Sequence, residues 1–287
     1  MSGSFSPATW PASDAAVVAE LRAAGCVFAE DEAALLVGAA RGPAELAAMV
    51  ARRVAGLPLE QILGWAEFCG LRIALEPGVF VPRRRTELLV RSAAATIGAD
   101  APDVDGTPDG ARNPVVVDLC CGSGAVGVAL AALLGQVELY AVDVDPAAAR
   151  CARRNVEGIG GQVFEGDLFA PLPASLRGRV DVLVANAPYV PTAEIRLMPA
   201  EARLHEPRVA LDGGADGLDL QRRVIDGASR WLAPGGHLLV ETSERQAPHT
   251  LEAFVRSGLV PRVLSSDELD ATVVVGSRAA RVTGADE

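Results

Sequence analysis

The sequence predicts an α/β fold, in which a doubly wound parallel or mixed sheet follows a smaller helical region. Three observations lead to this prediction. From Val115 onward, short runs rich in β-branched residues alternate with windows rich in alanine and leucine, which is typical of such sheets. A glycine-rich loop directly follows the first of these runs. The length of 287 residues, at ~150 residues per domain, leaves room for a second, smaller domain before the sheet.

Three helices are expected at the N-terminal end, and a glycine ends each of them. The first spans Asp14 to Ala24 with Ser13 as its cap, the second spans Asp31 to Ala40, and the third spans Pro43 to Ala55. A proline at the first position of the third helix already has the backbone angle that the helix needs. These short helices predict a helical domain over residues 1–64.

The spacing of apolar residues changes between Trp65 and Val81, from a helical period toward a period of two. Gly70 and the pair Pro77-Gly78 divide this stretch, as in a small hairpin. Another helix is expected from Thr86 to about Ile97, and a surface loop rich in proline, glycine and aspartate from Asp100 to Asn113. We therefore expect a β-hairpin linker over residues 65–82 and an α/β domain over residues 83–287.

The α/β domain is expected to alternate strands with helices. The expected strands are Val115–Leu119, Glu138–Val142, the Phe164 region, Val180–Ala185, His237–Glu241 and Thr272–Val275. The expected helices are Val126–Leu134, Pro146–Glu157 and Leu218–Trp231. Ligands of such sheets bind at the carboxyl ends of the strands, so the functional residues should follow the first four strands.

Composition argues against several classes of protein. Half of the residues are hydrophobic, which excludes a disordered chain, and the net charge of −11 argues against a broad nucleic-acid-binding face. No apolar stretch approaches the ~20 residues that span a bilayer, and the first ten residues lack the pattern of a secretory leader. The five cysteines lack paired C-x-x-C spacing, so neither a disulfide framework nor a metal site is expected. We expect a cytoplasmic protein that contacts no membrane and does not bind nucleic acid directly.

The glycine loop predicts a cofactor that contains adenosine. Gly122, Gly124 and Gly127 have the G-x-G-x-x-G spacing of dinucleotide-binding loops, between a strand and a helix as in Rossmann-like folds. Asp143 ends the second strand, 21 residues after Gly122, where an acidic residue commonly holds a ribose diol. These features support NAD and other adenosine cofactors about equally.

Asp118 distinguishes between these cofactors, because it ends the first strand and is expected to point toward the loop. A carboxylate there would repel a pyrophosphate, but it would attract the sulfonium and α-ammonium groups of S-adenosylmethionine. We therefore predict S-adenosylmethionine as the cofactor. The expected cofactor-binding residues are Asp118, Cys120, Cys121, Gly122, Ser123, Gly124, Asp143, Asp167, Leu168 and Asn186.

Two groups among these residues have expected roles of their own. Cys120 and Cys121 have no histidine nearby in the sequence, so we interpret them as packing residues of the loop and not as nucleophiles. Asp167 follows the third strand, where a carboxylate can accept a hydrogen bond from the amino group of adenine. Leu168 and Phe169 would then lie against the adenine ring.

The tetrad Asn186-Ala187-Pro188-Tyr189 directly follows an apolar strand. An amide beside a rigid X-Pro bond and an aromatic ring suits the holding of a planar NH2 group. The side-chain oxygen of Asn186 and the carbonyl of Ala187 would accept its two hydrogens, and Tyr189 would cover its face. The nitrogen lone pair would then point at the methyl sulfonium, so catalysis would depend on orientation and desolvation. We predict Asn186, Pro188 and Tyr189 as catalytic residues, and the whole tetrad as substrate-binding.

With this tetrad, the chain resembles the PrmC/HemK family of protein-glutamine N5-methyltransferases, which modify the Gly-Gly-Gln glutamine of peptide chain release factors. The resemblance covers nearly the whole chain. The matching segments are Pro58–Gly64, Phe68, Val81–Arg83, Thr86-Glu87, Asp118–Gly124, Asp143, Gly166–Phe169, Asn186–Tyr189, Glu206–Arg208 and Gly217-Leu218. The resemblance implies a class I methyltransferase domain, a helical N-terminal domain that recognises the substrate, and a release factor or a related translation protein as the partner.

The chain departs from the family pattern at two places. The family tetrad is Asn-Pro-Pro-Tyr, and Ala187 replaces its first proline. Pro188 still holds Ala187 in an extended conformation, whereas Asn186 loses that restriction. Arg84 and Arg85 stand where the family has proline followed by an acidic residue, on the linker expected to face the protein substrate. These departures leave open another substrate, such as a glutamine of a ribosomal protein.

Other functions also stay open on the sequence alone. Base amines of nucleic acids are planar NH2 groups too, although the net charge and the absence of a target-recognition domain count against them. A small-molecule N-methyltransferase is a second alternative. A non-catalytic cofactor-binding scaffold and an NAD-dependent oxidoreductase are less favoured, because Asn186, Tyr189 and Asp118 argue against them.

Overall fold

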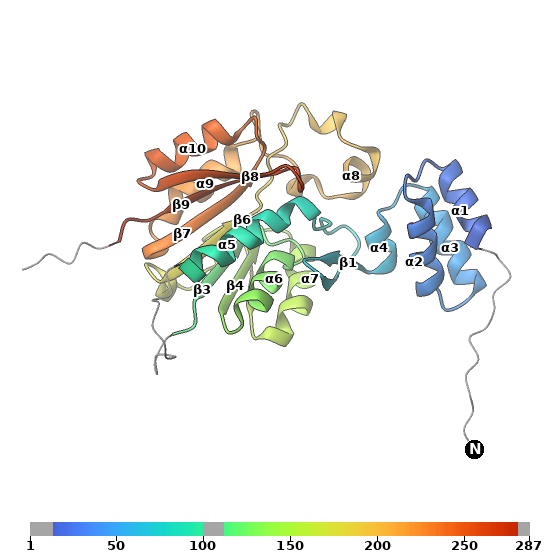
Figure 1. The fold of residues 1–287 in the computed structure, drawn as a ribbon, viewed down its shortest axis with the longest axis horizontal. Coiled ribbons are helices and arrows are strands. Elements are labelled where there is room, and N and C mark those ends of the chain that lie inside the picture. The colour runs from blue at the N-terminus through green and yellow to red at the C-terminus, as the bar shows by residue number, and fades with distance from the viewer. Residues whose placement is uncertain (1–13, 100–111, 281–287) are drawn as a thin grey trace, which may run out of the picture.

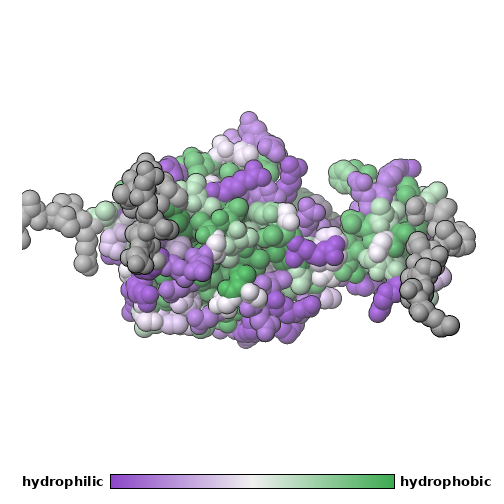
Figure 2. All heavy atoms as spheres, turned by 60° about the horizontal axis from the view of Figure 1, so that its bottom comes forward, coloured by the Kyte–Doolittle hydropathy of each residue, from purple (hydrophilic) through white to green (hydrophobic). Residues whose placement is uncertain are grey.

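The computed structural model describes residues 14–99 and 112–280, so the Ser13 cap and most of the expected loop Asp100–Asn113 lie outside the described residues. A bundle of short helices stands at one end of the molecule (Figure 1). A small hairpin joins this bundle to a larger α/β body. In a space-filling view the bundle is a separate lobe beside that body (Figure 2).

The helical bundle contains α1 (Asp14–Ala23), α2 (Ala29–Ala39), α3 (Pro43–Val54) and α4 (Leu59–Leu63). The first three helices confirm the sequence prediction to within two residues at each end. The sequence pattern did not predict α4, because five residues are too few to show a helical period. The buried core of the bundle includes Leu21, Leu36, Leu46, Val50 and Ile62.

The hairpin consists of β1 (Trp65–Phe68) and β2 (Leu71–Ala74), paired antiparallel with Phe68 opposite Leu71. Cys69 and Gly70 form the two-residue turn, both with positive φ, which suits the right-handed twist of the strands. Asn155 of the α/β body fastens the hairpin: its side chain accepts from the amide of Ala74 at 2.9 Å and donates to the carbonyl of Ala74 at 2.8 Å. The hairpin is thus fixed to the body.

A seven-stranded sheet forms the centre of the α/β body, in the order β5-β4-β3-β6-β7-β9-β8. The strands are β3 (Val115–Leu119), β4 (Glu138–Asp143), β5 (Gln162–Glu165), β6 (Val180–Ala185), β7 (Leu232–Thr242), β8 (Val260–Ser266) and β9 (Ala271–Ser277). The first five are parallel, and β9 is antiparallel to both of its neighbours. The strand order reverses between β3 and β6, and ligands of doubly wound sheets bind at such a point.

The sequence pattern did not predict β8, and it placed the start of β7 five residues too late. Exposed and partly buried residues alternate along β8, because it is an edge strand, so no apolar run marks it. The first part of β7 contains Pro234-Gly235, which reads as a turn in the sequence. There the pairing register with β6 shifts, and the strand continues.

The α/β body also contains several helices, and some of them pack on opposite faces of the sheet. They are α5 (Glu87–Ala99), α6 (Ala125–Leu134), α7 (Pro146–Val156), α8 (Ala200–His205), α9 (Asp219–Ala228) and α10 (Ala247–Arg256). Val115 and Val117 pack with α9 and α10, whereas Val116 packs with α5 and α6 on the opposite face. The sequence prediction omitted α8 and α10 and made α9 too long at both ends. Within the described residues, no helix has the length and apolar character needed to cross a membrane.

Candidate functional site

A cavity opens at the carboxyl edge of the parallel strands. Its lining combines the glycine loop, the ends of β4, β6 and β7, the start of α5 and the segment after α8. The lining residues used below are Arg85, Thr86, Asp118, Cys120, Gly122, Asp143, Asp167, Leu168, Asn186, Ala187, Tyr189 and Glu241. The structure therefore brings together most of the residues that the sequence singled out.

The glycine loop has the tight form that its sequence predicts. Cys120, Gly122 and Gly124 all have positive φ, and α6 begins at the next residue. The amide of Gly122 donates to Oδ2 of Asp143 at 2.8 Å, which ties the loop to the end of β4. A Cβ at Gly127 would come within 3.0 Å of Leu139, so glycine there lets α6 pack closely on the sheet.

Asp118 is 2% exposed, and it lines the cavity at the end of β3. Its Oδ2 accepts from the amide of Gly127 at 3.0 Å, so the side chain also satisfies the first turn of α6. Burial raises the pKa of Asp118 to about 7, and the negative charge of Asp143 adds to the rise. A cation in the cavity would favour the ionised carboxylate.

Asp143 is held at the end of β4 by two backbone amides. Its Oδ2 accepts from Gly122 and its Oδ1 accepts from Asp145 at 2.9 Å. Burial raises the pKa of this carboxyl as well. Each oxygen still has a lone pair available, so the side chain can also accept hydrogen bonds from a diol.

The segment after β5 only partly matches the expectation. Leu168 is buried in the cavity lining, with a positive φ of 49°. Asp167 also lines the cavity, but its carboxylate is more than half exposed and forms an ion pair with Arg223 at 2.6 Å. Phe169 is not part of the cavity lining; its ring stacks on Trp231 with centroids 5.7 Å apart. The structure therefore does not bring Phe169 into the cavity beside Leu168, as was expected.

The two loop cysteines are packing residues rather than activated thiols. Cys121 is buried, and Cys120 packs against the core of the sheet. Burial raises the pKa of both thiols well above the usual range, and the nearby carboxylates add to the rise. At neutral pH both are therefore protonated and poorly nucleophilic.

The tetrad lies where β6 ends. The side-chain nitrogen of Asn186 donates to the hydroxyl of Thr86 at 3.1 Å, although the two residues are 100 positions apart. Ala187 is fully buried. The hydroxyl of Tyr189 donates to Oε1 of Glu241 at 3.3 Å, and burial together with that carboxylate raises the pKa of Tyr189 to about 12.

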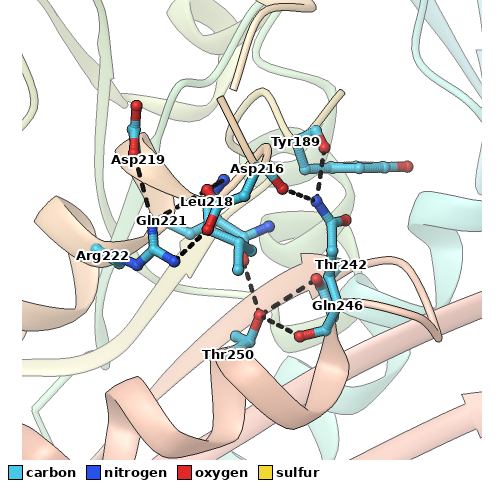
Figure 3. A network of polar contacts seen from close by, with 9 residues as sticks. All are labelled: Tyr189, Asp216, Leu218, Asp219, Gln221, Arg222, Thr242, Gln246 and Thr250. Carbon is cyan, nitrogen blue, oxygen red and sulfur yellow. Dashed lines mark hydrogen bonds and ion pairs between the residues drawn. The ribbon is translucent and has the colours of Figure 1, made fainter. Parts of the chain in front are cut away.

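The backbone of the tetrad is supported by Gln246, the residue before α10 (Figure 3). The side-chain nitrogen of Gln246 donates to the carbonyls of Tyr189 at 2.9 Å and Asp216 at 3.0 Å. Gly217, with a φ of +81°, passes so close that a Cβ would collide with the carbonyl of Tyr189 and the side chain of Gln246. A glycine is therefore required at this position.

Further contacts join this support to the end of β7 (Figure 3). The side-chain nitrogen of Gln221 on α9 donates to the carbonyl of Glu241 at 3.0 Å. Thr250 on α10 donates to the side-chain oxygen of Gln221 at 3.0 Å. Side chains of α9 and of the start of α10 thus support the backbone at Tyr189 and Glu241.

Sequence reasoning missed two residues of this site, Thr86 and Glu241. Thr86 was expected as the start of a helix and as part of a family-matching segment, without a role in the site, and it ends the 3-10 turn Arg84–Thr86 that precedes α5. Glu241 carries the signal that found Asn186: a polar side chain after an apolar strand, at the carboxyl edge of the sheet. The expected strand ended at Glu241, so this signal was present and not used.

Comparisons with known proteins relate the chain to methyltransferases. Residues 107–214 fit a family model described as the methyltransferase small domain. The chain is 41% identical to a release factor glutamine methyltransferase of Geobacter sulfurreducens, over 82% of this chain and 79% of that protein. It is 39% identical to a 4-amino-L-phenylalanine/4-methylamino-L-phenylalanine methyltransferase of Streptomyces pristinaespiralis, over 73% of this chain and 69% of that protein.

The fold is also found among solved structures. The T. thermophilus 16S rRNA N2 methyltransferase RsmC, in complex with AdoMet and guanosine, has a TM-score of 0.51 and 20% sequence identity to this chain. The match covers 75% of this chain and 49% of that chain. The α/β body is therefore a class I methyltransferase fold, as the sequence predicts.

Proposed function

The chain belongs to the family of release factor glutamine methyltransferases, and we propose that it transfers a methyl group from S-adenosylmethionine to a glutamine side-chain nitrogen of a peptide chain release factor. The observation that carries this proposal is the position of Asn186. Its amide is anchored to Thr86 in the same cavity that Asp118 and Asp143 line. One cavity therefore combines carboxylates suited to a cationic cofactor with an amide group suited to a planar substrate.

The cavity residues fit S-adenosylmethionine better than NAD. Among the described residues, neither Asp118 nor Asp143 forms an ion pair, and both are largely buried. Buried carboxylates without a counter-charge favour a cationic ligand and oppose a pyrophosphate. When bound, S-adenosylmethionine supplies an electrophilic methyl group. Asp118 would face its positive charge, and Asp143 would accept hydrogen bonds from its ribose.

The residues of the tetrad would orient the substrate amide. An amide nitrogen is a weak nucleophile because its lone pair is delocalised. Oδ1 of Asn186 and the carbonyl of Ala187 would accept its two hydrogens, which raises the electron density on nitrogen and fixes its direction. Tyr189, with its pKa raised to about 12, stays protonated at neutral pH and would cover the amide face.

The helical bundle would recognise the rest of the protein substrate. We assign residues 1–64 to this task, 65–82 to the linker and 83–287 to the methyltransferase domain. Arg53 of α3 supports a functional connection, because it forms ion pairs with Glu32 at 2.5 Å inside the bundle and with Glu201 of α8 at 2.8 Å. The segment after α8 lines the cavity. We place the reaction in the cytoplasm, with the proposed substrate.

Mass spectrometry tests this function. The protein is incubated with a release factor and isotopically labelled S-adenosylmethionine, and we expect the label on the glutamine of the Gly-Gly-Gln motif. A release factor with alanine in place of that glutamine should stay unlabelled. Asn186→Ala should lower kcat on the order of 10²-fold with the fold intact. An unlabelled release factor, or full activity of Asn186→Ala, would overturn the proposal.

A free aromatic amine is the second candidate substrate. The observation that favours it is the 39% identity to the S. pristinaespiralis enzyme, which is named for 4-amino-L-phenylalanine. The same labelling experiment with this amino acid in place of the release factor separates the two candidates. Label on the amine and none on the release factor would favour the second candidate.

A further inference from the structure

Thr86 occupies a central position in the site although it is 2% exposed. It ends the 3-10 turn before α5, and its hydroxyl accepts a hydrogen bond from the side-chain nitrogen of Asn186 at 3.1 Å. A hydroxyl that accepts one hydrogen bond still has its own hydrogen to donate. A buried donor of this kind requires an acceptor nearby.

Glu241 lines the same cavity and offers a buried carboxylate to this hydroxyl. Ala185 of β6 pairs with Val240 of β7, so Asn186 and Glu241 are neighbours at the carboxyl edge of the sheet. Glu241 is 2% exposed, its Oε1 accepts from Tyr189, and its buried Oε2 has no hydrogen-bond partner within the described residues, so it can accept a further hydrogen bond. Burial raises the pKa of this carboxyl, and hydrogen bonding with Thr86 together with the charge of Arg85 opposes the rise.

We propose that Thr86 and Glu241 are positioning residues, which fix the side-chain amide of Asn186 so that Oδ1 faces the substrate. The proposal rests on the function proposed above, since it assigns the orientation of the catalytic amide. Neither residue needs to touch the substrate. Glu241 orients the hydroxyl of Thr86, and Thr86 orients the amide of Asn186; we call this chain of contacts the relay.

The relay works because an asparagine amide has two ends of nearly equal shape. Rotation by 180° exchanges oxygen and NH2, and a hydroxyl alone accepts either arrangement, since it can donate or accept. The carboxylate of Glu241 removes this freedom, because an ionised carboxylate only accepts. Thr86 must then donate to Glu241 and accept from Asn186. Oδ1 consequently points away from Thr86 and is free to accept a hydrogen from the substrate amide.

The flipped arrangement would be inactive. Asn186 would then present NH2 to the NH2 group of the substrate, and two donors do not form a hydrogen bond. Arg85 contributes to the active arrangement, because its positive charge favours the ionised form of Glu241. This gives a role to one of the two arginines that depart from the family pattern.

Substitutions at Thr86 test the relay through activity. Thr86→Val keeps the shape and removes the hydroxyl, and we expect it to lower kcat about tenfold, the cost of one oriented hydrogen bond. The KM for S-adenosylmethionine and the Tm should change little. Thr86→Ser keeps the hydroxyl and should retain most of the activity. In an Asn186→Ala background, Thr86→Val should cause no further loss, because the group that it positions is gone. An equal loss in both backgrounds would overturn the relay.

Nuclear magnetic resonance tests the same relay without any substrate. The chain has three asparagines, Asn113, Asn155 and Asn186, so ¹⁵N-asparagine labelling gives three pairs of side-chain amide signals, and Asn186→Ala identifies the pair of Asn186. We expect a nuclear Overhauser effect between the NH2 protons of Asn186 and the methyl group of Thr86. Glu241→Gln should weaken it, because glutamine can either donate or accept.

The two experiments separate the two proposals. If the release factor is not methylated but the Overhauser effect is present, the proposed function fails and the relay stands. If the release factor is methylated but the wild-type Overhauser effect is absent, or if Glu241→Gln leaves it unchanged, the relay fails and the function stands.

Discussion

The side chain of Gln246 donates a 2.9 Å hydrogen bond to the main-chain carbonyl of Tyr189, across 57 positions in the sequence. The same nitrogen also holds the carbonyl of Asp216. One buried side chain therefore joins the tetrad Asn186–Tyr189 to the loop before α9. The backbone at Tyr189 is therefore held by this amide in addition to the strand that precedes it.

Replacing Gln246, which does not line the cavity, should lower both stability and activity. Gln246→Leu leaves the carbonyls of Tyr189 and Asp216 without this buried donor, which should cost about 1–3 kcal/mol of folding free energy and lower kcat. Thermal unfolding and steady-state kinetics measure the two effects. Arg245→Ala is the matched control, because the neighbouring Arg245 forms an exposed ion pair with Glu194. Equal behaviour of the two variants would contradict the supporting role of Gln246.

Cofactor binding should depend on pH through Asp118. The pKa of Asp118 is raised from 3.8 to about 7 in the folded protein, so its contribution to stability is fully present below pH 3.8 and is lost as pH rises through about 7. A cationic ligand favours the ionised carboxylate and lowers its pKa. Affinity for S-adenosylmethionine should therefore increase with pH up to about 7 and then level off.

Calorimetry at pH 6 in two buffers of different ionisation enthalpy measures this linkage. Binding should release a proton, because the cofactor causes Asp118 to ionise. Asp118→Asn has the same shape and no charge, so its proton release should be smaller and its affinity lower. Proton release that is unchanged in Asp118→Asn would assign the linkage to another group.

Restoring proline at position 187 should keep or raise activity on a release factor. Ala187→Pro would limit Asn186 to the extended region and remove backbone freedom from the unfolded chain. The comparison of kcat between this variant and the wild type measures the effect. A loss of activity on the release factor, with folding intact, would indicate that Ala187 makes room for a different target.

The contact between bundle and body should govern recognition of the protein substrate. Glu201→Gln removes the charge that Arg53 meets on α8 and leaves the ion pair between Arg53 and Glu32 intact. We expect a several-fold rise in the KM for the release factor and an unchanged KM for S-adenosylmethionine. Arg52→Ala, on the exposed side of the same helix, is the control. A rise in the KM for the cofactor alone would exclude this role.

Local sequence patterns predicted those parts of the fold whose physical cause is local. The glycine loop, the acidic residue after β4 and the tetrad after β6 meet because parallel strands end at one edge. Thr86 could not be assigned to the site in this way, since its partner Asn186 is 100 positions away and Thr86 does not follow a strand of the sheet. Glu241 ends an expected strand and could have been assigned, but its contact with Tyr189, 52 positions away, was not visible in the sequence. The ion pair of Asp167 with Arg223 also depends on tertiary packing, and it was not visible in the sequence.

Two elements were missed because their sequences lack the pattern that marks a helix or a strand. The edge strand β8 has no buried run, and α4 is too short to show a period. Leu168 and Phe169 were both expected beside an adenine ring, yet only Leu168 lines the cavity and the ring of Phe169 packs on Trp231. Neighbouring residues of a loop often point in different directions, and only the surrounding packing decides which of them reaches a ligand.

Asn155 holds the hairpin at Ala74 and also donates to the carbonyl of Ser123 in the glycine loop. This side chain thus fixes the hairpin, which precedes the α/β body and follows the helical bundle, to the glycine loop of the cavity. A protein substrate that contacts both the helical bundle and the cavity would have to present its glutamine at a matching distance from the surface that docks on the bundle. The enzyme would then select one glutamine by its distance from the surface that docks on the bundle. It would reject other glutamines even where the neighbouring residues are the same.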